Sequence, residues 1–91
     1  MEHDFKLVFR LQASDADVDA LIERLYEAGC DDASIGIGAQ GRIALAFTRA
    51  ADSATEAIVS AFRDVKRAIP TAELIEVEHS SVQLANLAAA I

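Results

Sequence analysis

The sequence predicts an α+β domain in which four antiparallel strands and two helices follow the order β-α-β-β-α-β. Three observations lead to this prediction: apolar residues alternate with period two in four segments, they recur at helical spacing in two others, and only a short turn separates the two middle strands. This order is that of the ferredoxin-like split βαβ sandwich, with an antiparallel four-stranded sheet and both helices on one of its faces.

The composition is that of one small folded domain. Of its 91 residues, 53% are apolar, and the low counts of Gly, Pro and Cys exclude collagen and disulfide scaffolds. The single Cys30 and an acidic N-terminus without a signal-peptide pattern predict a cytoplasmic protein. No apolar run approaches about 18 residues, so no membrane segment is expected. The net charge of −7 argues against nucleic-acid binding by this chain itself.

The first strand and the first helix are expected over residues 4–12 and 15–28. Apolar and polar side chains alternate in the strand, as in a sheet with one buried face. Ser14 and Asp17 form an S-x-x-D capping box at the start of the helix. Gly29 supplies the residue with positive φ that commonly follows a helix.

Two strands, over residues 33–38 and 42–49, are expected to form a hairpin. The stretch from Gly36 to Gly41 also matches G-x-G-x-x-G, but the dinucleotide fingerprint requires a helix after the loop, and here a strand follows. We therefore favour the hairpin and keep a nucleotide loop as the minor alternative. The side chains expected to point inward are Ile35, Ile37, Ile43, Leu45 and Phe47.

The second helix begins at a capping box over residues 53–56 and ends at Pro70. The last strand is expected over residues 73–79, with Ile75 and Val77 inward. All the phenylalanines fall on inward positions, which a register slip of one residue would expose. They are Phe5, Phe9, Phe47 and Phe62.

The C-terminal segment, residues 80–91, contains no charged side chain and forms a unit separate from the domain over residues 1–79. Leu84, Leu87 and Ile91 recur at helical spacing, which predicts a C-terminal helix. Twelve residues are too few for a stable isolated helix, so this apolar stripe needs a partner surface.

The outer face of the predicted sheet is the main candidate interaction site. Small side chains replace the long charged ones that normally solvate an open face, so this face suits close docking of a helix or a second subunit. A merely small-residue surface is the alternative. No aromatic residue is present to stack on RNA bases, and a homodimer is the default assembly. The small residues are Ser34, Gly36, Gly38, Ala44, Ala46 and Thr48.

No set of residues with catalytic or metal-binding spacing is found. A structural zinc site usually has four Cys or His ligands in closely spaced pairs. This requirement is not met by the candidate set Cys30, Asp31, Asp32 and His79. Cys30 also has no general base placed beside it. We therefore expect a non-enzymatic protein with no cofactor and no metal.

A basic cluster lies at the end of the second predicted helix. Arg63, Lys66 and Arg67 complement the negative end of the helix dipole, and Asp52 and Glu56 lie at the opposite end. Contact with an anion or with a DNA backbone is the alternative.

Three stretches of the chain resemble a family of small bacterial DNA-binding proteins. They are E-A-G-C-D-D within residues 26–36, G-R-I-A-L-A-F within residues 41–49 and R-A-I-P within residues 65–74. In that family a ferredoxin-like region precedes a helix-turn-helix. Residues 83–91 resemble the first helix of that helix-turn-helix. The resemblance implies a dimerisation or partner-binding domain of a DNA-binding regulator, truncated here, that contacts DNA only through a missing C-terminal extension.

A small-molecule sensor of the ACT type is the alternative function. ACT domains share the predicted topology and bind amino acids at subunit interfaces, and Gly29 matches the glycine they place between the first helix and the second strand. This alternative depends on fold analogy.

Overall fold

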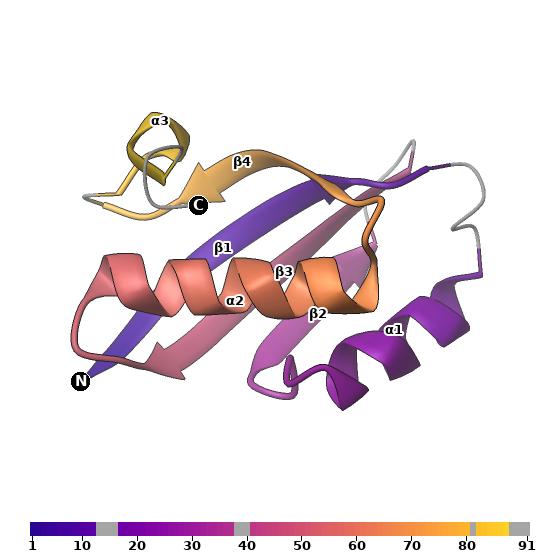
Figure 1. Cartoon of the computed structure of the whole chain (residues 1–91), viewed down its shortest axis with the longest axis horizontal. Helices are drawn as coiled ribbons and strands as arrows, with labels where there is room; N and C mark the ends of the chain where they lie inside the picture. The colour runs from indigo at the N-terminus through magenta and orange to yellow at the C-terminus, as the bar shows by residue number, and fades with distance from the viewer. Residues whose placement is uncertain (13–16, 38–40, 81, 88–91) are drawn as a thin grey trace.

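The computed structural model describes residues 1–12, 17–37, 41–80 and 82–87 of the chain (Figure 1). Its four strands form one antiparallel sheet in the order β2-β3-β1-β4, so β2 and β4 are the edge strands. The elements, in chain order, are β1 (Glu2–Arg10), α1 (Val18–Glu27), β2 (Ala33–Ile37), β3 (Arg42–Ala50), α2 (Ala54–Ala68), β4 (Glu73–Glu78) and α3 (Leu84–Leu87).

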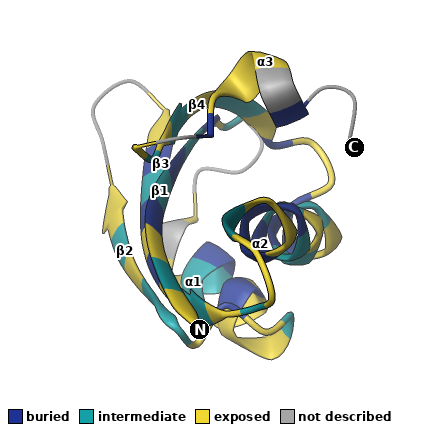
Figure 2. Cartoon of the chain, turned by 90° about the vertical axis from the view of Figure 1, so that its left-hand side faces the viewer, coloured by how far each residue is buried: buried dark blue, intermediate teal, exposed yellow. Residues whose placement is uncertain are grey.

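The two long helices cover one face of the sheet and leave the other face open (Figure 2). The α+β class predicted from the sequence is confirmed. No helix in the described part of the chain is long and apolar enough to cross a membrane.

Side-chain caps fix where the helices begin. Ser53 Oγ accepts a hydrogen bond from the Glu56 backbone N–H at 3.1 Å, as the capping box predicts. The first helix begins later than expected, because Asp17 is itself the N-cap and its carboxylate accepts from the Ala20 N–H at 3.2 Å. The predicted cap Ser14 lies outside the described residues. Gly29 has a φ of 107°, which confirms it as the helix stop.

The core lies between the sheet and the helices, and the phenylalanines are central to it. Phe5 stacks on Phe47 with 5.2 Å between ring centroids, and Phe9 stacks on Phe62 at 6.2 Å. Phe5, Phe9 and Phe47 are buried, and Phe62 is partly buried and packs against the same core. The predicted inward register of β1 and β3 is therefore confirmed.

Two predicted inward positions are wrong. The β1–β4 ladder shifts register between Val8 and Phe9, so Phe9 pairs with Leu74. This irregularity adds one residue to β4, and Leu74 packs against the core where Ile75 was expected. Ile37 pairs with Ile43 and shares its face, but its exposed fraction is 49% because it lies at the end of an edge strand that the helices leave uncovered.

The C-terminal helix expected over residues 80–91 is not seen. The described residues there form only the four-residue turn α3 beside β4 (Figure 1), and residues 81 and 88–91, including Ile91, lie outside the description. Leu87 and Val82 are buried in the core of this chain, with exposed fractions of 1% and 7%. Val82 and Leu87 therefore pack on the core of their own domain.

Candidate interaction surfaces

The structure brings the predicted outer-face residues together. Ser34 pairs with Ala46 and Gly36 pairs with Ala44 across the β2–β3 ladder. Thr48 lies on the same face of β3, where its hydroxyl donates to Asp4 Oδ1 at 2.7 Å. Five of the six predicted residues thus form one continuous surface, and the sixth, Gly38, lies outside the described residues.

Most of the charge on the outer face lies on β1 and β4, and Arg42 at the start of β3 adds one more charge beside Arg10. Lys6 pairs with Glu78 at 2.8 Å, and this hydrogen bond raises the pKa of Lys6. Arg10 lies 3.5 Å from Glu73. At Ser34 and Gly36 and their β3 partners the face presents only small neutral side chains, so another chain can approach closely without desolvating a charge.

Arg49 of β3, which no local sequence pattern singles out, donates hydrogen bonds from all three of its guanidinium nitrogens. Its Nε and Nη2 donate to the two carboxylate oxygens of Asp32 at 2.7 and 2.9 Å. Its Nη1 donates to Asp64 at 2.9 Å and to Ser60 Oγ at 3.2 Å, and Nη2 also donates to the Gly29 carbonyl at 2.9 Å. All five N–H groups of the guanidinium are used.

This network joins three parts of the fold. It links β3 to α2 and to the turn between α1 and β2, and the Arg49 side chain is only 12% exposed. Donation to the Asp32 carboxylate raises the pKa of Arg49. Because both carboxylates are paired with the guanidinium, Asp32 is not free to bind a metal. No group of three or more His, Cys, Asp or Glu side chains that could hold a metal occurs within the described residues.

Cys30 lies beside this network and is fully buried. Burial, with the nearby Asp64 carboxylate second, raises the pKa of its thiol from 9.0 to about 11. A nucleophilic cysteine needs the opposite shift, toward the thiolate. Cys30 is therefore a core residue in the described structure.

The raised pKa of Cys30 predicts a pH dependence of stability. Between pH 9.0 and about 11 the unfolded chain loses the thiol proton while the folded chain retains it, so the unfolded state binds fewer protons and stability falls as pH rises. From about pH 8 to about pH 10.5 we expect wild type to lose about 2 kcal/mol more than Cys30→Ala. Urea titrations at the two pH values measure the difference, and equal losses would contradict the assignment.

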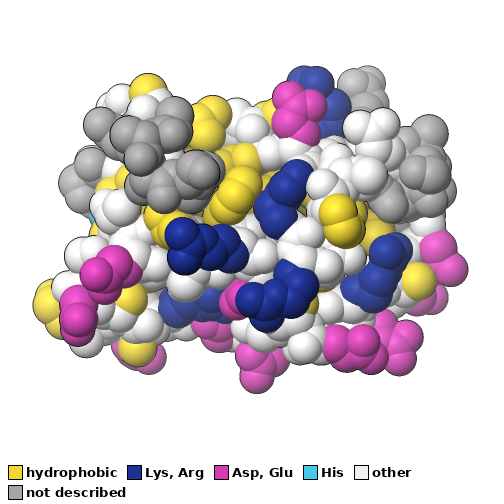
Figure 3. Space-filling model, in the orientation of Figure 1, with side chains coloured by type: hydrophobic (Ala, Val, Ile, Leu, Met, Phe, Trp, Pro, Cys, Tyr) yellow, Lys and Arg dark blue, Asp and Glu magenta, His cyan; other side chains and the backbone are white. Residues whose placement is uncertain are grey.

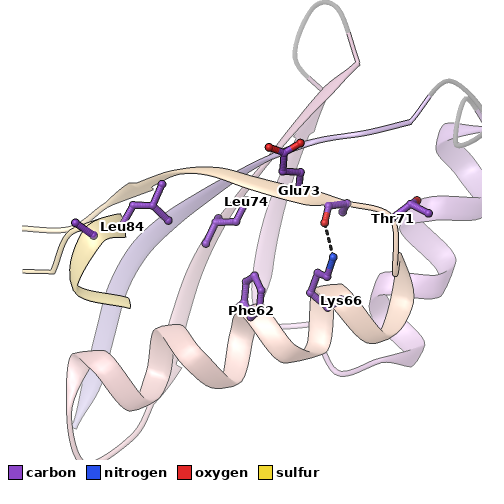
Figure 4. Close-up of a pocket in the computed structure, with 8 residues that line it drawn as sticks. Phe62, Lys66, Thr71, Glu73, Leu74 and Leu84 are labelled. Carbon is purple, nitrogen blue, oxygen red and sulfur yellow. Dashed lines mark hydrogen bonds between the residues drawn. The ribbon is translucent and has the colours of Figure 1, made fainter. Parts of the chain in front are cut away.

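An apolar groove lies between α2, β4 and α3 (Figure 4). Its volume is about 470 Å³, within the usual range of small-molecule sites. Phe62 and Lys66 project from α2 toward β4, and Leu84 closes the groove from α3. The residues lining it are Phe62, Lys66, Thr71, Ala72, Glu73, Leu74, Leu84 and Ala85.

Lys66 is the cation of this groove. Its Nζ donates to the carbonyls of Pro70 and Ala72 at 2.8 and 2.7 Å, which supports the predicted role of the basic cluster at the end of α2. No carboxylate of the described residues lies within ion-pair distance of this ammonium, whereas Arg67 lies 3.7 Å from Asp64. Lys and Arg side chains gather over the helical layer beside the hydrophobic patch (Figure 3).

No family model, no curated protein and no solved structure matches this chain. The structure provides an α+β fold with a small-residue outer face and an apolar groove beside α3.

Proposed function

We propose that this chain is a non-catalytic dimerisation or partner-binding module. The observation that carries the proposal is the uncovered half-sheet of small neutral side chains at Ser34, Gly36, Ala44 and Ala46. A chain with a net charge of −7 keeps this area free of charge, although an open sheet face is normally solvated by polar side chains. Because this charge-free area extends to the edge strand β2, a like-charged second copy can approach there at the lowest electrostatic cost.

The wider setting that we propose is a bacterial DNA-binding regulator with a ferredoxin-like domain. The order βαββαβ and the strand order β2-β3-β1-β4 support this arrangement, and the resemblance of residues 26–36, 41–49 and 65–74 supports the regulator. DNA would be contacted by a C-terminal extension and not by the domain itself. The negative net charge supports this division, since DNA binding by phosphate contacts needs a basic face.

The module is expected to be a dimer in solution. Sedimentation equilibrium between about 5 and about 500 μM should show a mass rising from 9.7 kDa toward twice that value. A small interface gives a weak, concentration-dependent dimer. A mass of 9.7 kDa at every concentration would contradict the proposed function.

The groove beside α3 favours a second candidate function, the sensing of a small apolar amino acid, as in the ACT-like alternative. Most of its lining residues are apolar, with Thr71 and Glu73 at its polar margin, and the Lys66 ammonium is the group that would hold a ligand carboxylate. Gly29 does not line this groove, and its carbonyl accepts a hydrogen bond from Arg49.

Thermal melting with leucine and phenylalanine at about 10 mM tests this second function. A ligand with a Kd of about 1 mM stabilises the chain by about 1.4 kcal/mol, which is a rise of several degrees in Tm. Aspartate should give no rise, and Leu84→Glu should abolish the rise because it replaces an apolar side chain of the groove with a carboxylate that repels the ligand carboxylate. Identical melting curves with and without the apolar amino acids would rule the function out.

A further inference from the structure

The outer side of β2 (Ala33–Ile37) is a free strand edge in the described structure. The Thr48 N–H donates to the Asp32 carbonyl at 3.2 Å, in register with the β2–β3 pairs. Hydrogen-bonded pairs alternate along an antiparallel ladder, so residues 34 and 36 bond to β3 and residues 33, 35 and 37 point their backbone groups away from the sheet. The Ala33 N–H bonds to the Cys30 carbonyl, which leaves both backbone groups of Ile35 and Ile37 and the carbonyl of Ala33 available.

This edge has none of the protection that β4 has. Folded proteins block edge strands with charges, prolines, bulges or a covering segment. β4 carries Glu73, Glu76 and Glu78, has the register shift against β1 and lies beside α3. β2 has no charged residue and no proline, and its register with β3 is unbroken.

We propose that a second copy of this chain pairs antiparallel with β2 about a two-fold axis at Ile35. This inference rests on the proposed dimerisation function and assigns its surface. In this register Ile35 faces Ile35 of the second copy and the two residues exchange both backbone hydrogen bonds. The Ile37 N–H of each copy donates to the Ala33 carbonyl of the other copy.

The side chains favour the same register. Ile37 is 49% exposed and Ile35 is partly buried, and both lie on the helix-side face of an uncovered edge. Pairing about Ile35 places Ile35 against its copy and Ile37 against Ala33 of the second copy, so apolar surface is removed from water on both sides of the axis. Two five-residue strands bury little area compared with a standard interface, which accounts for a weak dimer.

The pairing also explains the small-residue outer face. Ser34 and Gly36 face each other across the axis on the opposite side of the joined sheet, and Ala46 and Ala44 are their β3 neighbours. The two small-residue areas thus become one neutral surface at the centre of an eight-stranded sheet. A further partner would dock on this surface, which the strand pairing leaves open.

Charge substitutions at the edge and on the face distinguish the two surfaces. Ile37→Lys places a charge on the edge, as natural edge strands do. It should raise the dissociation constant of the dimer at least about tenfold. Ala46→Glu on the outer face should leave the dimer intact. Dimer retained in Ile37→Lys but lost in Ala46→Glu would overturn the edge assignment and keep the proposed function, whereas a monomeric wild type would contradict both. Circular dichroism checks that each variant is folded.

Cysteine crosslinking tests the register itself. Ile35→Cys puts two thiols in directly opposed positions about 5.5 Å apart between Cα atoms, which a disulfide spans. Ile37→Cys is the matched control, because its copies lie four strand positions apart, roughly 13 Å. Cys30 is buried and remains in both variants. Mild oxidation should crosslink Ile35→Cys and not Ile37→Cys. Equal crosslinking of the two, or none in a folded Ile35→Cys at dimeric concentration, would overturn the proposal.

Discussion

Arg49→Gln should destabilise the folded chain by about 3 kcal/mol. The substitution removes the guanidinium from between Asp32 and Asp64, whose side chains are only 30% and 19% exposed. It leaves Asp32 without its partner and Asp64 with only Arg67, 3.7 Å away. Breaking such a partly buried pair costs about 3–5 kcal/mol, and the partial exposure of Asp32 places the effect at the lower end. Urea unfolding at neutral pH measures the loss.

Two variants separate this network from ordinary charge effects. Arg42→Gln removes an exposed arginine from the same strand and should change stability by less than about 0.5 kcal/mol. Arg49→Lys keeps the charge but not the planar fork that holds Asp32 through two bonds, so it should recover only part of the loss. Equal stability of Arg49→Gln and Arg42→Gln would show that the network contributes nothing.

Phe9→Ala should cost about 3–5 kcal/mol, the usual cost of a phenylalanine-sized cavity. Phe9 is fully buried at the centre of the sheet and stacks on Phe62. A domain of this size is stable by only about 5–10 kcal/mol, so the variant should be largely unfolded at 37 °C. Phe9→Leu, which keeps most of the volume, should melt cooperatively, and so should Leu84→Ala at a partly exposed position. Normal melting of Phe9→Ala would contradict the inward register of β1.

Local patterns were sufficient to predict most of the fold. The alternation around Phe9, the cap at Ser53 and the stop at Gly29 each depend on residues close together in the sequence. The wrong predictions lie where contacts between residues far apart in the sequence determine which side chain faces the core. The shift between β1 and β4 exchanges Ile75 for Leu74, and no feature of β4 alone reveals it.

The candidate site shows the same division. The small residues of β2 and β3 were predicted to share a face, because strand alternation alone determines it. The Arg49 network could not be predicted, since its partners Asp32 and Asp64 lie on separate elements that only the folded chain brings together. The groove at Lys66 was missed for the same reason. Of the predicted terminal stripe, Leu87 is buried in the chain's own core, Leu84 is exposed, and Ile91 lies outside the described residues.

The measurement that most directly tests β2-mediated dimerisation is amide hydrogen exchange along β2 at two concentrations. In the monomer the Ser34 and Gly36 amides bond to β3 and should exchange slowly, while the Ile35 and Ile37 amides point away from the sheet and should exchange fast. At a concentration where sedimentation shows the dimer, all four amides should exchange slowly. Fast exchange of Ile35 and Ile37 in the dimer would contradict pairing through this edge.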